Sequence, residues 1–340
     1  MRSVERSLVT IDLGAIRRNA ATLRRVARGA ELWAVVKADA YGHGALDVSR
    51  AALEGGATAL CVATLAEALP LRAEFSEARV VVMGPVDDLA AARGAGLELV
   101  AADGRVPEGV PTHLKLDTGM GRWGLSELPA PTRHVVGVMS HLASAESDTE
   151  FTRAQIERFR GATAGLADVT RHLANSAGTL TYPDARFDAV RCGIALYGIS
   201  PSGGDPAADG LEAALRWESH LALVKRLAPG ASTGYGRRFV AERETWIGIV
   251  PVGYADGFRR DLTGTHVAVE GRPAPVVGTV SMDAIAVELG REHPRGTVVT
   301  LVGERVTIEE HARVAGTIGY EIATGIVSGD GRARRVVRDG

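Results

Sequence analysis

The sequence predicts an N-terminal (β/α)8 barrel of the TIM type followed by a C-terminal, mainly antiparallel β domain. Short, nearly continuous Val-, Leu- and Ala-rich runs recur over about the first 200 residues, each followed by a loop and a helix-like stretch. After about residue 213 the runs become longer, alternate in polarity and are separated by Gly and Pro. We therefore expect the barrel over residues 1–213 and the β domain over residues 214–340.

Eight runs are predicted as barrel strands, namely 32–38, 59–63, 80–83, 97–101, 113–116, 135–140, 171–174 and 189–192. Continuous apolar character is typical of parallel strands that are covered on both faces. The segment 151–166 predicts an amphipathic helix whose apolar stripe holds Phe151, Ala154, Ile156 and Phe159. The number of strands favours a barrel. A doubly wound sheet would show the same alternation of strands and helices.

The second half predicts six strands, namely 220–227, 245–252, 265–269, 275–280, 283–288 and 297–302. One helix is expected at about 308–318, because Thr307 and Glu310 have the spacing of a capping box at its start. A segment rich in Gly, Pro and Asp, residues 201–210, lies where the two patterns meet and predicts a linker.

Composition gives no reason to expect nucleic acid or an anionic membrane as a partner. The formal net charge is −2, with 46% hydrophobic and 24% charged residues. No apolar run reaches the roughly 18 residues of a membrane span, and the first residues contain no secretory apolar core. Cys61 and Cys192 lie in apolar runs without metal-ligand spacing, which predicts buried thiols and fits a cytoplasmic protein. The basic residues of 332–338 predict a solvated tail.

Polar residues gather where the predicted barrel strands end, and barrel enzymes place their chemistry there. Lys37 directly follows an apolar run. It is either a lysine that extends its amine to solvent, or an amine desolvated for Schiff-base formation. Further polar residues at predicted strand ends are Lys115, Asp117, Arg122, His141, Asn175, Ser176 and Arg191. The small-residue turns 175–178 and 193–194 suit phosphate binding through backbone N–H groups. An apolar-flanked lysine beside a phosphate site suggests a cofactor with an aldehyde and a phosphate, such as pyridoxal phosphate (PLP).

The segment VVKADAYGHG (35–44) resembles the cofactor-lysine signature of the alanine racemase family. Further segments resemble family motifs in the same order: KLDTGMGRWG (115–124), SHLASAES (140–147), HLANSAG (172–178), RCGIALYG (191–198), TGYG (233–236), PVGYADG (251–257), SMD (281–283) and GTIGYE (316–321). The resemblance spans nearly the whole chain. It implies the barrel, the β domain and a homodimer with shared active sites that interconverts L- and D-alanine, supplying D-alanine for peptidoglycan.

The resemblance implies a two-base mechanism. Lys37 holds PLP and serves the proton on the D face of the substrate, and Tyr235 of the other subunit serves the L face. Tyr235 is linked through His141 to Arg191, and cationic neighbours of this kind are what a tyrosine needs to act as a base. Arg191 also matches the residue that faces the pyridine nitrogen of the cofactor. Because arginine keeps its proton, this match favours a racemase over related barrel decarboxylases, which place an acidic residue there.

The same resemblance assigns the phosphate contacts to Tyr41, Ser176, Gly193 and Ile194. The substrate carboxylate is assigned to Arg122 and to the backbone of Met282 from the partner chain. Lys115 matches a lysine that many family members carry in carbamylated form. Tyr254 and Tyr320 match residues that line a narrow entry to the site, which would favour alanine over larger substrates.

Three positions depart from the family pattern. Cys192 stands where proline is common, Ser281 where cysteine is frequent, and Ser328 lies near the place of a tyrosine that contacts phosphate, so that contact is not assigned. Two alternatives stay open: a broad-specificity or serine racemase of the same fold, and a non-catalytic PLP carrier. No compact cluster of His, Asp and Cys residues predicts a metal site.

Overall fold

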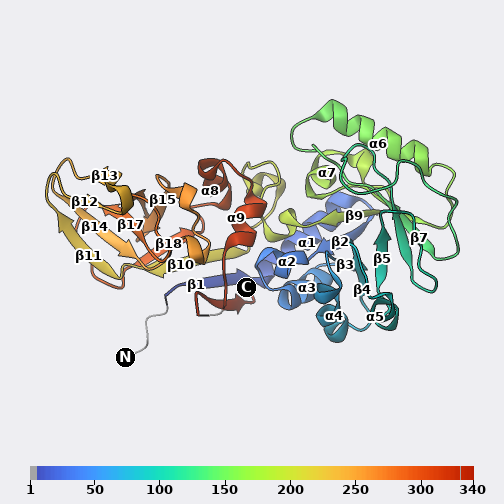
Figure 1. Cartoon of the computed structure of the whole chain (residues 1–340), viewed down its shortest axis with the longest axis horizontal. Coiled ribbons are helices and arrows are strands. Elements are labelled where there is room, and N and C mark those ends of the chain that lie inside the picture. The colour runs from blue at the N-terminus through green and yellow to red at the C-terminus, as the bar shows by residue number, and fades with distance from the viewer. Residues whose placement is uncertain (1–5, 330) are drawn as a thin grey trace. The chain divides into compact units, whose positions relative to one another are not determined.

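A computed structural model describes residues 6–329 and 331–340, so residues 1–5 of the predicted barrel range lie outside it. The chain divides into two compact units, Leu13–Glu212 and Ala213–Gly340, and the second unit also takes in the segment that ends at Asp12 (Figure 1). No described helix is both long and apolar enough to cross a membrane.

The first unit is a closed barrel of eight parallel strands, which confirms the predicted fold class. The strands are β2 (Glu31–Val35), β3 (Ala59–Val62), β4 (Arg79–Val82), β5 (Glu98–Ala101), β6 (Thr112–Lys115), β7 (Val135–Met139), β8 (Thr170–His172) and β9 (Ala189–Cys192). The barrel closes between β9 and β2, where Trp33 pairs with Arg191. In this arrangement the carboxyl ends of all eight strands share one rim.

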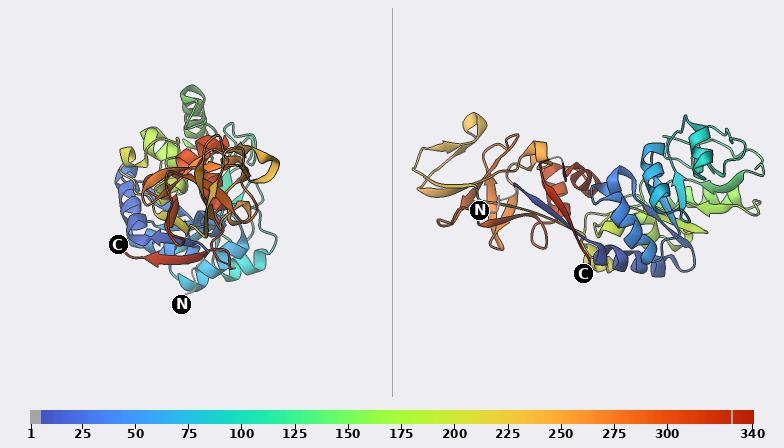
Figure 2. Two further views of the ribbon diagram at one scale, coloured as in Figure 1. Left: turned by 90° about the vertical axis from the view of Figure 1, so that its left-hand side faces the viewer. Right: turned by 90° about the horizontal axis from the view of Figure 1, so that it is seen from below.

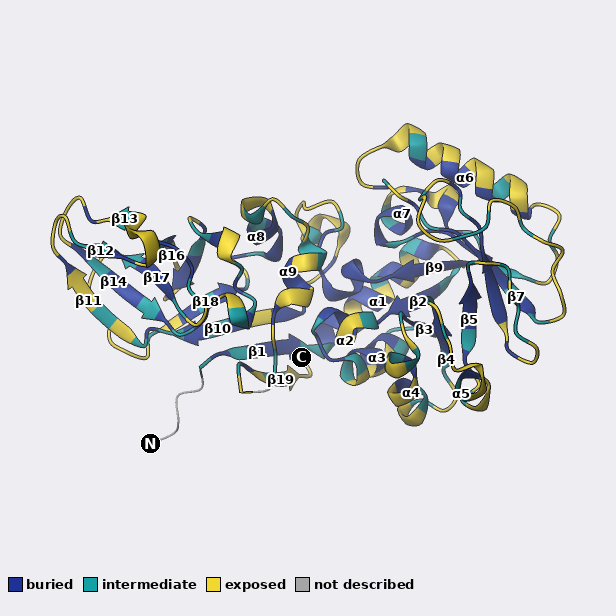
Figure 3. Cartoon of the chain, in the orientation of Figure 1, coloured by how far each residue is buried: buried dark blue, intermediate teal, exposed yellow. Residues whose placement is uncertain are grey.

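Seven α-helices accompany these strands, namely α1 (Leu13–Ala27), α2 (Lys37–Tyr41), α3 (Ala45–Glu54), α4 (Leu65–Glu74), α5 (Leu89–Gly94), α6 (Thr149–Thr163) and α7 (Ser176–Thr181). The predicted amphipathic helix is α6. Its buried face holds Thr152, Gln155, Ile156 and Phe159, whereas Phe151 is half-buried and Ala154 is exposed, so the predicted stripe was partly wrong (Figure 3).

Two connections of the barrel lack a helix. Residues 102–111 join β5 to β6 and residues 116–134 join β6 to β7, and within these described segments no helix forms. The first contains Pro107 and Pro111 and the second Pro129 and Pro131. Proline removes a backbone donor and clashes with the preceding helical turn, so these prolines disfavour a helix in either segment.

The second unit is built on a nine-stranded sheet in the order β11-β14-β17-β16-β15-β18-β10-β1-β19, with a separate pair β12-β13. Its strands are β1 (Leu8–Asp12), β10 (Leu215–His220), β11 (Leu223–Leu227), β12 (Ser232–Thr233), β13 (Phe239–Val240), β14 (Thr245–Val250), β15 (His266–Val269), β16 (Arg272–Val277), β17 (Ile285–Leu289), β18 (Val298–Val302) and β19 (Arg334–Arg338). Neighbours are antiparallel except β1 and β19, which run parallel side by side (Figure 2). Helices α8 (Ile308–Ala315) and α9 (Gly319–Gly325) complete the unit, and the expected capping box of Thr307 and Glu310 is present.

Three expectations need correction. Residues 8–12 fell in the predicted barrel range, yet they form β1, which pairs with β10 and β19 in the β unit. The predicted strand 220–227 is two strands, because the chain leaves its partner β18 after His220 and pairs with β14 from Leu223. The expected basic tail is part of strand β19. In each case the partner that decides the structure is distant in sequence.

Candidate active site

Lys37 begins an unusual left-handed turn at the end of β2. The strand stops at Val35, not at Ala38 as predicted, and Ala38–Tyr41 adopt φ values of 50–55°. Residues with a Cβ avoid this region at a cost of roughly 1–2 kcal/mol each. Hydrogen bonds hold the turn in place: Ala38 N donates to Glu67 Oε1 at 2.7 Å, and Ala45 N donates to Asp39 Oδ1 at 2.7 Å. Strain maintained in this way is typical of functional sites.

The Lys37 amine lies in a half-buried, cationic environment. Burial and then the positive charge of Arg122 lower the pKa of Lys37, and Glu67 opposes this effect. A lowered pKa increases the share of neutral amine, which is the form that attacks a carbonyl carbon. The structure therefore favours the chemical interpretation of Lys37 over a lysine that merely reaches solvent.

Tyr41, Ser176, Gly193 and Ile194 come together at the ends of β2, β8 and β9. The Ser176 hydroxyl accepts hydrogen bonds from Gly193 N at 3.1 Å and Ala195 N at 3.3 Å. A Cβ on Gly193 would lie 2.5 Å from Tyr41 Oη, so glycine here lets the Tyr41 ring keep its place. Ile194 is fully buried, and nothing in the described part of the chain accepts a hydrogen bond from its N–H. Buried backbone donors are nearly always paired, so this group suits an acceptor brought by a ligand.

Arg191 lies on β9, where its two Nη atoms have three carbonyl oxygens and two imidazole nitrogens within hydrogen-bond distance. Its Nη atoms donate to the carbonyl oxygens of His172, Ser140 and Leu173 at 2.7–3.1 Å. They also face two imidazoles, His172 Nδ1 at 2.9 Å and His141 Nδ1 at 3.3 Å. Among residues 6–329 and 331–340, no group accepts a hydrogen bond from the Nε–H of Arg191. Burial lowers the pKa of Arg191 to about 10, so the guanidinium remains charged near neutral pH.

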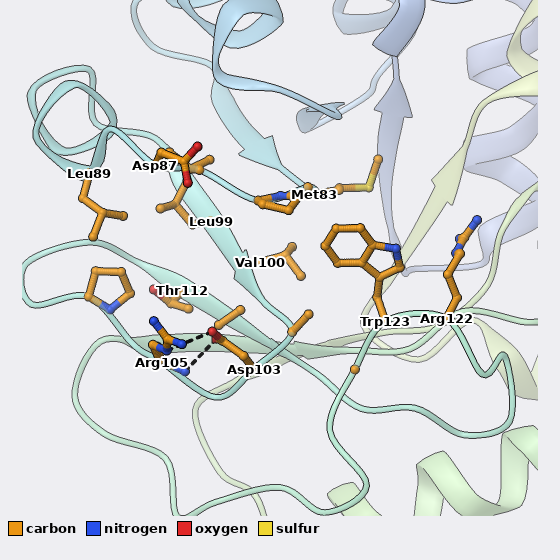
Figure 4. A pocket seen from close by; sticks show the side chains of 17 residues that line it. Met83, Asp87, Leu89, Leu99, Val100, Asp103, Arg105, Thr112, Arg122 and Trp123 are labelled. Carbon is orange, nitrogen blue, oxygen red and sulfur yellow. Dashed lines mark hydrogen bonds and ion pairs between the residues drawn. The ribbon is translucent and has the colours of Figure 1, made fainter.

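Lys115 is buried among the same cations. Burial and then Arg191 and Arg122 lower its pKa to about 8, with Asp117 acting in the opposite direction. Arg122 is exposed on the loop after β6. Together with Trp123, it borders a cavity of about 570 Å³ beside β4 and β5, which the helix-free loop after β5 also lines (Figure 4).

The remaining predicted residues lie in the β unit. Tyr235 follows β12 and is 73% exposed, and Met282 is 50% exposed. Tyr254 N donates to Ser281 O at 3.0 Å and Ala255 N to Met282 O at 3.1 Å, so the loops of Tyr254 and Met282 are joined through their backbones. Gly253 permits this approach, because a Cβ there would lie 2.2 Å from Ser281 O. Tyr320 lies half-buried on α9.

Two family models match the sequence: the alanine racemase N-terminal domain over residues 11–201 and the alanine racemase C-terminal domain over residues 214–337. The chain belongs to the alanine racemase family. An alanine racemase of Levilactobacillus brevis is 38% identical over 365 aligned residues, which cover 97% of each protein.

Solved alanine racemases also share the fold. The enzyme from D-cycloserine-producing Streptomyces lavendulae superposes with a TM-score of 0.92 at 35% identity, covering 100% of this chain and 98% of that one. The enzyme from Bartonella henselae, described with covalently bound pyridoxal phosphate, superposes with a TM-score of 0.86 at 28% identity, covering 98% and 99%.

In this alanine racemase family member, the sequence did not point to several residues that shape the site. Five of them were assigned no role from the sequence: His113, His172, Glu98, Glu67 and Asp39. One signal was available: His113 precedes Lys115 by two residues in one strand, so both side chains face the barrel interior. The roles of Glu67 and Asp39 could not be inferred, because they hold a backbone turn that the sequence does not reveal.

Proposed function

We propose that this chain interconverts L- and D-alanine with pyridoxal phosphate as cofactor. The observation that carries the proposal is the constellation at one barrel rim: a strained turn that presents a half-buried Lys37 with a lowered pKa, beside Arg191 held by two imidazoles. Membership of the alanine racemase family supports the reaction. The C-terminal model match also counts against the carrier alternative, since such carriers are single barrels.

The residues present fit the cofactor. Lys37 would bind it covalently, the Ile194 N–H, Ser176 and Tyr41 would hold its phosphate, and Arg191 Nε would donate to its ring nitrogen. When bound, the cofactor withdraws electrons from the Cα–H bond of the amino acid. Arg191 cannot give up its proton to the ring nitrogen, so it would hold that nitrogen by a hydrogen bond without protonating it, which would moderate the electron withdrawal. That behaviour suits racemisation.

Two groups on opposite faces of Cα would exchange the proton. Lys37 serves one face and Tyr235 of the partner subunit the other, which requires a homodimer. Arg191 donates to His141 Nδ1, so the neutral His141 carries its hydrogen on Nε2. Burial and the charge of Arg191 hold the pKa of His141 well below its ordinary value, which keeps the ring neutral. Its Nε2–H can then donate to the oxygen of Tyr235 and stabilise the phenolate.

Substrate binding would use Arg122 for the carboxylate together with the backbone of Met282 of the partner subunit. We propose that Lys115 is carbamylated: its neutral amine attacks CO2 and releases one proton, giving a carbamate anion. That anion would lie among Arg122, Arg191 and Lys37, which replaces repulsion by attraction. Tyr254 and Tyr320 would narrow the entry, which favours alanine over serine and larger amino acids.

The two buried free thiols, Cys61 and Cys192, support action in the reducing cytoplasm. There the product would supply D-alanine for peptidoglycan.

The deciding experiment starts from pure L-alanine in D2O with enzyme and pyridoxal phosphate. We expect D-alanine that carries deuterium at Cα, and no product with Lys37→Ala. Rates on L-serine and L-lysine in the same assay separate alanine racemase from a broader enzyme. Cofactor binding at Lys37 with neither Cα exchange nor D-alanine would overturn the proposal.

A further inference from the structure

A series of buried hydrogen bonds leads from Arg191 to the opposite end of the barrel. Arg191 Nη1 lies 2.9 Å from His172 Nδ1, His172 Nε2 lies 3.0 Å from His113 Nδ1, and His113 Nε2 lies 2.8 Å from Glu98 Oε2. Both imidazoles are completely buried. Glu98 is the first residue of β5, whereas Lys37 follows the last residue of β2. In a parallel barrel these positions belong to opposite ends.

The direction of every hydrogen bond in this series is determined. Arginine only donates, so His172 Nδ1 must accept and His172 must carry its hydrogen on Nε2. Because His172 Nε2–H donates to His113, the Nδ1 atom of His113 must accept. His113 therefore carries its own hydrogen on Nε2, from which it donates to the carboxylate of Glu98. Burial lowers the pKa of both imidazoles, in agreement with two neutral rings.

The carboxylate at the far end is a permanent acceptor. Arg79 donates to both oxygens of Glu98, at 2.9 and 3.0 Å. Burial raises the pKa of Glu98, but the hydrogen bonds from His113 and Arg79 outweigh it and lower the pKa to about 2. Arg79 also donates to Glu31 at 3.1 Å, and Glu31 contacts neither imidazole.

The barrel interior makes room for this arrangement. A Cβ on Gly137 of β7 would lie 2.1 Å from His113 Nδ1, so glycine is needed for the ring to fit. The Trp33 ring packs against His172 and His113, with ring centroids 4.4 and 5.5 Å apart. Barrel interiors are usually filled with branched apolar side chains, and two imidazoles there are tolerated only when fully hydrogen-bonded.

We propose that Glu98, acting through His113 and His172, is a positioning residue of the racemase reaction. It fixes the tautomer of both imidazoles so that Arg191 meets a lone pair and not an N–H. The inference rests on the proposed function, in which Arg191 faces the cofactor ring and His141.

Glu98→Gln tests the mechanism directly. His113 and Arg79 Nη2 share one oxygen of Glu98, and Arg79 Nε donates to the other. A glutamine has a single acceptor oxygen for these three donors, and when that oxygen accepts from Arg79 Nε, its NH2 faces His113 Nε2. His113 must then carry its hydrogen on Nδ1, and so must His172, which sets two donors against each other at Arg191. Glu31→Gln is the matched control, because it neutralises the other carboxylate bound by Arg79 and the glutamine oxygen can still accept from Trp33 Nε1, while no hydrogen bond to an imidazole changes.

We expect Glu98→Gln to lower kcat about tenfold or more, with KM for alanine changed by less than about twofold. The visible absorption of the bound cofactor should shift in the same variant. Glu31→Gln should keep the wild-type kcat and spectrum, and melting curves verify the fold of each protein. Equal effects of the two variants, or wild-type kinetics in a folded Glu98→Gln whose His113 carries its hydrogen on Nδ1 by the NMR measurement below, would overturn the inference.

A second measurement does not depend on enzyme activity. Nitrogen-15 NMR of histidine-labelled, cofactor-free protein reports which ring nitrogen carries hydrogen, with signals identified through His113→Gln and His172→Gln. We expect hydrogen on Nε2 of both rings and no titration between about pH 6 and 9. Hydrogen on Nδ1, or titration of either ring, would contradict this series of hydrogen bonds. Wild-type protein with the expected tautomers but no racemisation would instead refute the proposed function.

Discussion

The two units hold their candidate residues in opposite ways. In the barrel, Lys37, Lys115 and Arg191 are half-buried or buried, and carbonyl oxygens and imidazoles position the Arg191 guanidinium. In the β unit, Tyr235 and Met282 are 73% and 50% exposed. The loops of these residues contain glycines that lie close to neighbouring backbone. Within residues 6–329 and 331–340, the Tyr235 hydroxyl makes no hydrogen bond, although the Tyr235 carbonyl accepts one from Thr279.

The barrel therefore presents charged groups whose partners are already in place, whereas the β unit presents exposed groups that can meet another molecule. A charged group can be positioned in advance only if its partners are folded around it. Exposed aromatic and thioether side chains on well-ordered loops are typical of surfaces that meet another molecule. The contrast supports the proposed homodimer, and the experiments below break or sharpen it, from the largest effect to the smallest.

Tyr235→Phe removes only the exposed phenolic oxygen. We expect racemisation to fall about 10²- to 10⁴-fold, the range of a lost general acid–base group, while cofactor binding at Lys37 persists. Racemisation rates and cofactor absorbance check this. Tyr182→Phe is the control, because that hydroxyl donates to Thr149 and to no candidate site residue among those the structure describes. Wild-type rates in Tyr235→Phe would mean that the barrel residues carry out racemisation without Tyr235.

Mixing two inactive variants tests whether sites are shared between subunits. Lys37→Ala and Tyr235→Phe, unfolded and refolded together, would form mixed dimers with one intact site each. Random pairing predicts recovery of about a quarter of wild-type activity. If each site belonged to a single chain, the mixture would stay as inactive as its components.

Gly193→Ala tests the contact of the phosphate cluster with Tyr41. Its Cβ would lie 2.5 Å from Tyr41 Oη, so Tyr41 must move, and we expect cofactor affinity to weaken about tenfold. Titration of the cofactor by absorbance measures this. Gly161→Ala should leave affinity unchanged, because nothing lies within 4 Å of a Cβ there. Unchanged affinity in Gly193→Ala would remove this cluster from the cofactor site.

Removal of CO2 tests Lys115. We expect activity to fall severalfold in CO2-free buffer and to recover with bicarbonate. The neutral amine is the reactive form, and its share rises as the pH increases through the pKa of about 8, so recovery should be faster at higher pH. A mass increase of one CO2 on the peptide of Lys115 identifies the product. Bicarbonate without effect on wild-type protein would exclude the carbamate.

Thr307→Ala should have the smallest effect. It removes the capping box of α8 and should lower the free energy of unfolding by about 1 kcal/mol. Denaturant unfolding measures this. The kinetics should match wild type, since α8 holds no candidate residue. A change in kcat would link the stability of the β unit to catalysis more closely than we expect.

The sequence was sufficient for the strands of the barrel. Apolar runs predicted all eight strands because each run reflects burial on both faces, and the polar residues at strand ends predicted one common rim. It was not sufficient for β1 and β19, whose short segments pair with each other, while β1 also pairs with β10.

Only the tertiary structure decided how the site is held. The left-handed turn after Lys37 depends on Glu67 in another helix, and no local preference predicts four successive residues with positive φ. The series from Arg191 to Glu98 joins strands β9, β8, β6 and β5, so its members are neighbours only after the barrel closes. Residue types and their spacing determine which groups a chain carries, whereas the packing of distant segments determines which lone pair faces which proton.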